Sequence, residues 1–295
     1  MNRREFLVSA AAAAAFTSKI AGQGDSKAAK LARVSAMSGC FGRLLAEAWG
    51  DRSHVDPPAL PGQAIDIMDL PEMLADRYGI HYVEVQQFHF VSTEPSYMKK
   101  FLGRLKVAKS RMSDMPLELD DRGYKGTISP CSPDPQARAK GIEMTKFWID
   151  RAAMLECPSV MINQGTLPED LTVSIEGLKT VSSYGASKNV AVLVEPRGRS
   201  TVDVLVELIT KSGCYANPDI GNLGDEEKTE RGLRMLYPLA KTVSHVKLNP
   251  SRFDFPTAIR ISKEMGFKGI YSLEAGGPTP YETVQNLLDQ LLQCM

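Results

Sequence analysis

The chain has 295 residues, and its 35 Lys and Arg side chains balance 35 Asp and Glu side chains, so the formal net charge is zero. A hydrophobic share of 43% and a charged share of 24% are ordinary for a globular protein and exclude a disordered, collagen-like or multi-span membrane chain. The balanced charge argues against a nucleic-acid partner, and five scattered cysteines are too few for a disulfide scaffold or a zinc ribbon.

The first residues have the pattern of an export signal. Arg3 and Arg4 are adjacent, and an Ala-rich apolar run follows them. A charged start with an apolar run of about 7 to 15 residues is typical of a signal peptide and is too short for a membrane span. The arginine pair resembles the twin-arginine signal of bacteria. We therefore expect a signal peptide over residues 1–24 and a mature domain over 25–295 without a stable membrane anchor. The mature domain is expected to be periplasmic or secreted. The alternative is that the first residues form an amphipathic helix or a membrane anchor.

Beyond this signal, short apolar segments alternate with longer amphipathic ones. The strand candidates are β-branched or apolar, end in Gly, Pro, Asn or Asp, and lie at 32–37, 81–86, 115–119, 159–163, 190–194, 214–218, 242–246 and 269–273. The helix candidates carry apolar residues at helical spacing and lie at 67–78, 95–110, 134–155, 169–187, 202–212, 224–239, 256–265 and 281–292.

Eight strand–helix units in roughly 265 residues predict a single-domain (β/α)8 barrel, the TIM barrel. A doubly wound open sheet is the alternative, but the sequence lacks the Gly-rich phosphate loop that usually accompanies it. Two long connections, at 38–64 and 120–135, are expected to extend over the mouth of the barrel, because connections of that length are usually functional or disordered.

Chemistry in such barrels takes place at the carboxyl ends of the strands. Four residues with metal-ligand chemistry stand at the ends of the last four predicted strands, spaced by 24, 26 and 29 residues: Glu195, Asp219, His245 and Glu274. Three carboxylates and an imidazole repel one another and lose hydration unless a cation lies among them. The sequence therefore predicts one divalent metal ion, with Mn²⁺, Mg²⁺ or Co²⁺ favoured by the oxygen-rich donors and Zn²⁺ also compatible.

This quartet resembles the metal site of the xylose isomerase-like TIM barrel superfamily, which includes sugar phosphate isomerases and epimerases and the ketose 3-epimerases. The resemblance extends over nearly the whole chain after the signal, and its specific part is 190–277. It implies that Glu195 and Glu274 are catalytic as well as metal ligands, and that they exchange a proton on opposite faces of a sugar. The metal would polarise a carbonyl and a hydroxyl of the substrate.

Several positions depart from the pattern of the ketose 3-epimerases. Asn222 stands where they typically have a His, and Pro196-Arg197 stands where they often have Asn-His. Lys247 replaces an Asp two residues after the strand-seven His, and Arg252 follows shortly afterwards. A Lys and an Arg beside the metal could bind a carboxylate, a phosphate or an enolate oxygen. The four metal ligands are therefore expected to be those of the ketose 3-epimerases, while the substrate contacts differ.

Further substrate contacts are expected from the earlier strands. Strand alternation places Glu84 on one face with Gln86, where related barrels contact sugar hydroxyls; a buried structural Glu paired with an Arg is the alternative. The complete set expected to bind substrate is Glu84, His89, Gln164, Asn222, Lys247 and Arg252.

The sequence thus predicts an exported, metal-dependent sugar isomerase or epimerase that removes a proton next to a carbonyl of a small carbohydrate. A lyase or hydrolase for keto glycosides and a non-catalytic sugar-binding barrel are the alternatives. An endonuclease of the related three-zinc type is disfavoured, because one strand-end histidine in the carboxyl-terminal half is too few and the neutral charge does not suit DNA. The resemblance also makes a homo-oligomer an expectation.

Overall fold

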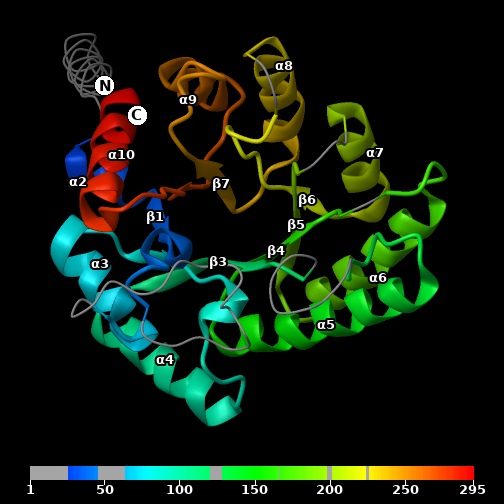
Figure 1. Ribbon diagram of the computed structural model, residues 1–295, viewed down its shortest axis with the longest axis horizontal. Coiled ribbons are helices and arrows are strands. Elements are labelled where there is room, and N and C mark those ends of the chain that lie inside the picture. The colour runs from blue at the N-terminus through cyan, green and yellow to red at the C-terminus, as the bar shows by residue number, and fades with distance from the viewer. Residues whose placement is uncertain (1–25, 46–63, 120–127, 166, 198–200, 224–225) are drawn as a thin grey trace, which may run out of the picture.

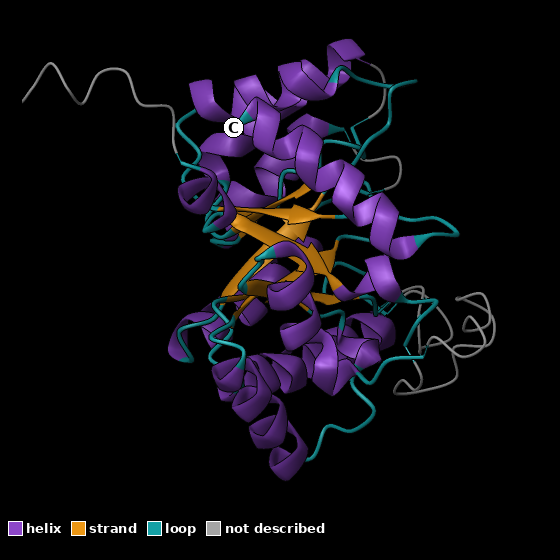
Figure 2. Cartoon of the chain, turned by 90° about the vertical axis from the view of Figure 1, so that its left-hand side faces the viewer, coloured by secondary structure: helices purple, strands orange, loops and turns teal. Residues whose placement is uncertain are grey.

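The computed structural model describes residues 26–45, 64–119, 128–165, 167–197, 201–223 and 226–295. Strands occupy the centre and helices surround them in two perpendicular views (Figure 1, Figure 2). The expected signal peptide, 1–24, and much of the expected loop 38–64 lie outside the described residues, so export stays a prediction. Within the described ranges, no helix combines the length and apolar character needed to cross a membrane.

Eight parallel strands form one sheet in the spatial order β6-β5-β4-β3-β2-β1-β8-β7. Their bounds are β1 Val34–Met37, β2 Tyr82–Glu84, β3 Arg111–Leu117, β4 Ser159–Asn163, β5 Ala191–Glu195, β6 Tyr215–Ala216, β7 Val243–Val246 and β8 Ile270–Leu273. The first strand, β1, pairs in parallel with the last, β8, as well as with β2, and contacts between the segments of β6 and β7 bring the two ends of the sheet together. The predicted single-domain TIM barrel is confirmed, and the open doubly wound sheet is not what the chain forms.

The helices after β1 follow the strands in the expected alternation, and a short helix that the sequence did not predict precedes β1. Their bounds are α2 Lys27–Leu31, α3 Leu70–Tyr78, α4 Pro95–Val107, α5 Pro135–Met154, α6 Thr172–Ser187, α7 Val202–Ser212, α8 Glu226–Leu236, α9 Phe255–Glu264 and α10 Pro280–Cys294. Side chains of Asp134, Thr201 and Asp254 cap the starts of α5, α7 and α9 by accepting a backbone N–H. Gly79 and Gly213 end α3 and α7 in the left-handed conformation that favours glycine.

The two ends of the sheet, β6 and β7, meet at a seam. In the described part of the chain, an isolated bridge joins Ala216 to Ala240, and the N–H of Ile220 donates to the carbonyl of His245 at 3.3 Å. The side chain of Asn217 adds a third link, because its Oδ1 accepts the N–H of His245 at 3.1 Å. The barrel therefore closes at this seam with help from side chains rather than by a regular ladder of backbone hydrogen bonds.

Strand alternation divides the core into two parts. Outward-facing residues such as Val160 and Val192 belong to the large core between strands and helices. The inward-facing residues Met161, Leu193 and Val243 form a small separate cluster inside the barrel. Two positions further along β4, β5 and β7, Asn163, Glu195 and His245 also face inward, next to this apolar cluster. They belong to the candidate metal centre or lie beside it.

Candidate metal centre

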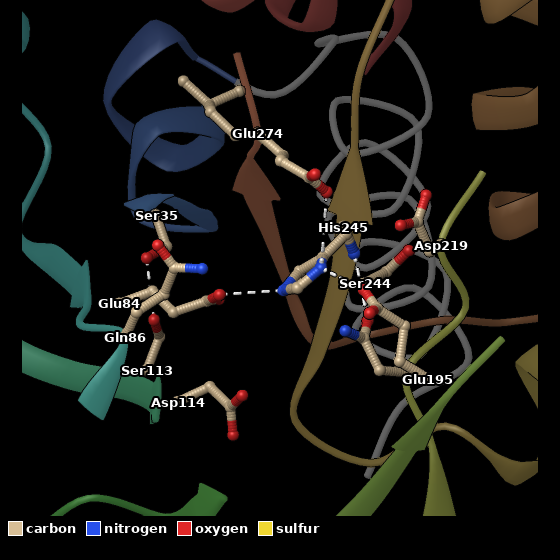
Figure 3. Close-up of polar contacts among 12 residues, drawn as sticks. Ser35, Glu84, Gln86, Ser113, Asp114, Glu195, Asp219, Ser244, His245 and Glu274 are labelled. Atoms are coloured by element: carbon tan, nitrogen blue, oxygen red, sulfur yellow. Dashed lines mark hydrogen bonds and ion pairs between the residues drawn. The ribbon is translucent and has the colours of Figure 1, made fainter. Parts of the chain in front are cut away.

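The four predicted metal ligands come together at the carboxyl end of the barrel. Glu195 ends β5 and His245 lies in β7, while Asp219 follows β6 and Glu274 directly follows β8. One ligand atom from each lies within 4.8 Å of the others, and all but Glu274 are buried. Figure 3 shows three of them, Glu195, Asp219 and Glu274, on one side of the His245 ring.

The imidazole of His245 is held in a defined orientation. Its Nε2 lies 2.8 Å from Oε1 of Glu84, and its Nδ1 lies 2.7 Å from Oε1 of Glu195 and 3.6 Å from Oε2 of Glu274. Burial disfavours the charged ring, but Glu84 and Glu195 outweigh this effect and raise the pKa of His245 well above its usual value. A metal-ligating histidine usually donates its second ring N–H to a carboxylate, which fixes the ring and increases its basicity. The ring is therefore set to present Nδ1 to an ion.

Glu84 occupies a different place from the one expected of a substrate contact. Its side chain is fully enclosed, on the far side of the His245 ring from the other carboxylates (Figure 3). This placement does not suit contact with sugar hydroxyls. It agrees with the alternative of a buried structural glutamate, except that the partner is His245 instead of an arginine.

Lys247 lies directly against two of the four ligands. Its Nζ is 2.7 Å from Oε2 of Glu274 and 2.9 Å from Oδ2 of Asp219. Burial acts to raise the pKa of Glu274, but Lys247 and His245 outweigh it and lower that pKa. Asp219 is more completely enclosed, and there burial raises the pKa to about 8 in spite of Lys247. The two neighbouring carboxyls thus differ in proton affinity.

The donor set fits a divalent ion. Three carboxylates and one imidazole nitrogen are the ligands that Mg²⁺ or Mn²⁺ accept, and thiolates, which favour softer metals, are not among the four. Ligand atoms on opposite sides of one Mg²⁺ lie about 4.2 Å apart. The 4.8 Å limit of this cluster therefore requires only a small inward movement of the side chains.

The predicted substrate residues near β7 separate into two groups. Asn222 lies beside the quartet, where its Oδ1 accepts from Lys247 Nζ at 3.4 Å. Arg252 instead lies on the exposed loop between β7 and α9, where it lines a hollow of about 780 Å³. Among the described side chains, none of the quartet is within hydrogen-bonding or ion-pair distance of Arg252. The structure brings Asn222 and Lys247 to the site and leaves Arg252 outside it.

The other two predicted substrate residues are buried. Nδ1 of His89 is 2.6 Å from Oγ of Ser38, so this ring is held by the segment that follows β1. Gln164 is also enclosed, and its Nε2 donates to the carbonyl of Arg197. Both side chains take part in packing the loops at the carboxyl end of the barrel, and their contact with a substrate stays a prediction.

Sequence reasoning missed a second polar cluster beside the quartet. Glu118 lies just after β3 and is buried, with Oε2 2.5 Å from Nη1 of Arg197 and 3.3 Å from Nδ2 of Asn163. Asn163 is in register with Glu195 across β4 and β5, so the cluster adjoins the candidate ligands. The rule that found the quartet, a polar residue at the end of a strand, would have found Glu118 if applied to the third strand.

Cys40 fixes the backbone around Glu274. Its thiol donates to the carbonyl of Leu273 at 3.2 Å and accepts the N–H of Ala275 at the same distance. Burial raises the pKa of Cys40 to about 12, so the thiol stays protonated and able to donate. The peptide groups on both sides of Glu274 are therefore tied to the segment that follows β1.

Comparison with known proteins gives the same fold. Residues 73–292 match the family described as "Xylose isomerase-like TIM barrel". Similar solved structures include a xylose isomerase-like TIM barrel protein from Mycobacterium smegmatis in complex with magnesium, at 14% identity and a TM-score of 0.61, covering 89% of this chain and 97% of that one. No curated protein matches the chain.

Two epimerases are also similar in structure. D-psicose 3-epimerase from Clostridium cellulolyticum H10, solved with D-tagatose, has 13% identity and a TM-score of 0.64, with 88% of this chain and 96% of that one covered. D-allulose 3-epimerase from Methylomonas sp. has 13% identity and a TM-score of 0.66, with 89% and 98% covered. At such identities the likeness concerns the fold alone.

Proposed function

The chain belongs to the xylose isomerase-like TIM barrel family, and from this premise we propose that it is a metal-dependent isomerase or epimerase of a sugar or sugar derivative. The observation that carries the proposal is the convergence of Glu195, Asp219, His245 and Glu274 within 4.8 Å at the carboxyl end of the barrel. Solved proteins of this fold that are named as sugar 3-epimerases, and one solved with magnesium, support the same reading.

In this proposal the two glutamates act on a substrate from different sides. Glu195 ends β5 and Glu274 follows β8, with Asp219 and His245 between them around the barrel. A carbohydrate that lies over the quartet would therefore have one glutamate on either side. A divalent ion held by the four residues would supply a Lewis acid for the carbonyl of the substrate.

The proposed reaction starts with proton abstraction. One glutamate takes a proton from the carbon next to the carbonyl, and the electron pair of that C–H bond forms an enediolate. The other glutamate returns a proton to the opposite face of the same carbon, which gives epimerisation. In isomerisation the proton returns to the former carbonyl carbon instead, and the hydroxyl proton moves from one oxygen of the enediolate to the other. Glu274 is the candidate base, because Lys247 and His245 lower its pKa and a bound divalent ion would also favour its ionised form.

One observation favours a second candidate, a lyase that acts on a keto glycoside. Lys247 contacts Glu274 and Asp219, and Arg197 adjoins the same end of the barrel. A cation close to the enediolate would stabilise it for long enough to expel a leaving group from the next carbon. The first step is the same, and the products distinguish the two reactions.

We also propose that the barrel is exported. Arg3 and Arg4 with the apolar run behind them support a twin-arginine signal over residues 1–24, a mature domain over 25–295 and a periplasmic or secreted location. The metal would be Mn²⁺, Co²⁺, Mg²⁺ or Zn²⁺, and a homo-oligomer stays part of the proposal.

The test measures bound metal and proton exchange together. We expect wild-type protein to retain about one metal ion per chain after incubation with Mn²⁺ or Co²⁺, and to exchange deuterium from D₂O into the carbon next to the carbonyl of a ketose or 3-keto-glycoside. Glu195→Gln and Glu274→Gln should slow this exchange by about 100-fold or more. Glu282→Gln, an exposed glutamate on α10, is the control.

The outcomes separate the candidates. Absence of metal in the wild-type protein would contradict the proposal at its first step. Metal binding without exchange on any sugar tested would favour a non-catalytic sugar-binding barrel. Exchange followed by release of an aglycone would identify the lyase.

A further inference from the structure

We propose that Lys247 is a built-in counter-ion of the metal centre, whose ammonium group holds the position between Asp219 and Glu274 in the metal-free protein and gives it up when an ion binds. The lysine would then set the affinity of the site for metal. This inference rests on the proposed function, since it concerns the same four ligands.

The ammonium group contacts two of the four candidate ligands. Nζ lies 2.7 Å from Glu274 and 2.9 Å from Asp219, two carboxylates that belong to different strand ends. A divalent ion bound by the quartet must contact the same two carboxylates. The ammonium and the ion therefore compete for the same two carboxylates, while Asn222, at 3.4 Å, can remain a partner of the lysine.

The chain is shaped to receive the lysine stem. A Cβ atom at Gly221 would lie within 2.8 Å of three carbons of the Lys247 side chain, so only glycine leaves room for the stem at this point. The N–H of Gly221 also donates to Oδ1 of Asp219 at 2.7 Å. The same short segment thus places the carboxyl group of Asp219 and makes space for the lysine beside it.

Charge explains why the lysine is needed without an ion and disfavoured with one. Glu195, Asp219 and Glu274 bring three carboxyl groups into a mostly buried cluster, where unpaired charge is costly. The side chain of Lys247 is 19% exposed, so its charge is largely removed from solvent and directed at these groups. A divalent ion brings two further positive charges to within a few ångströms of the ammonium, and the repulsion favours displacement of the lysine.

An ordinary structural ion pair would behave differently. In that case Lys247 would keep Asp219 and Glu274 in place, and its loss would leave the ligands less ordered and the metal bound more weakly. The direction of the change in metal affinity therefore distinguishes a competitor from a supporting contact.

The experiment compares Lys247→Met with wild type. Lys268→Met, at an exposed lysine just before β8, is the matched control. Binding of Mn²⁺ to metal-free protein is followed by the electron paramagnetic resonance signal of free Mn²⁺, and thermal unfolding is measured with and without Mn²⁺. We expect Lys247→Met to bind Mn²⁺ at least ten-fold more tightly, to unfold several degrees lower without metal, and to recover with Mn²⁺; the control should match wild type.

Gly221→Ala gives a second variant that removes no charge. Its methyl group displaces the lysine stem, so Mn²⁺ affinity should again rise. Equal or weaker Mn²⁺ binding in both variants, with normal binding in wild type, would overturn this inference and leave the metal centre standing. If wild type and variants all fail to bind Mn²⁺, the metal centre and this inference fall together.

Discussion

Replacing Glu84 with glutamine is expected to weaken metal binding about ten-fold while the barrel stays folded. The glutamine has the same shape, and its amide oxygen can still accept the Nε2–H of His245, whose distance to Glu84 is 2.8 Å. What is lost is the negative charge, which makes the imidazole a stronger ligand through the opposite nitrogen.

The magnitude follows from the contact. A buried hydrogen bond to a charged group contributes about 1.5 to 3 kcal/mol, and a neutral one about 0.5 to 1.5 kcal/mol. The difference of about 1 to 1.5 kcal/mol corresponds to about a ten-fold change in affinity. Stability should change less, because burial and the charge of Glu84 together raise the pKa of the nearby Asp114, and the amide removes that repulsion.

The assay is a Mn²⁺ titration of metal-free Glu84→Gln beside wild type, with urea unfolding of both. Glu169→Gln, at an exposed glutamate before α6, serves as the control for loss of one negative charge. A dissociation constant within two-fold of wild type would refute the view that Glu84 orients and strengthens His245. A loss equal to that of the control would assign the effect to net charge alone.

Gly177→Ala and Gly103→Ala should change stability in opposite directions in urea unfolding. A Cβ at Gly177 in α6 would overlap the carbonyl oxygen of Pro130 and should destabilise the fold by about 1 to 3 kcal/mol. A Cβ at Gly103 in α4 meets nothing within 4 Å and should stabilise the helix by about 0.5 to 1 kcal/mol. Stability changes of the same sign in both variants would contradict the packing. Metal affinity should depend on pH, because burial raises the pKa of Asp219 to about 8 and the pKa of His245 is also raised, so that an ion must displace protons from both. Mn²⁺ affinity should rise by about ten-fold per displaced proton for each pH unit between about pH 6 and pH 8. The metal-free protein should lose stability as the pH rises from about 6 to 8, because its folded state holds protons that the unfolded state has released. Mn²⁺ titrations check the rise in affinity, and urea unfolding in EDTA checks the fall in stability. An affinity or a stability that does not change with pH would contradict the corresponding prediction.

The barrel could be predicted from sequence because each unit repeats the same local pattern. The strand at 159–163 was placed at its observed bounds, and the next was placed one residue early. The third strand was predicted at 115–119 but runs from Arg111 to Leu117. Its first half contains Ser113 and Asp114, which line a polar part of the barrel interior, so a criterion based on apolar residues could not detect it.

The positions of the four ligands could also be predicted, because parallel strands bring their carboxyl ends to one edge. The contacts around them could not. Glu84 and His245 are 161 residues apart, and Glu118 and Arg197 are 79 apart, so these pairs depend on the curvature of the closed sheet. Strand spacing placed Lys247 near the site without indicating that its stem would cross Gly221 and reach two ligands.

The seam between β6 and β7 gives the metal centre a mechanical consequence. Asp219 follows β6 and His245 lies in β7. In the described chain, only a few hydrogen bonds connect the segments of these two strands. An ion bound to both Asp219 and His245 would cross-link β6 and β7, which have few hydrogen bonds between their described residues. The rigidity of the barrel, and the exchange of its backbone amide hydrogens with solvent, would then depend on whether an ion is bound at the metal centre.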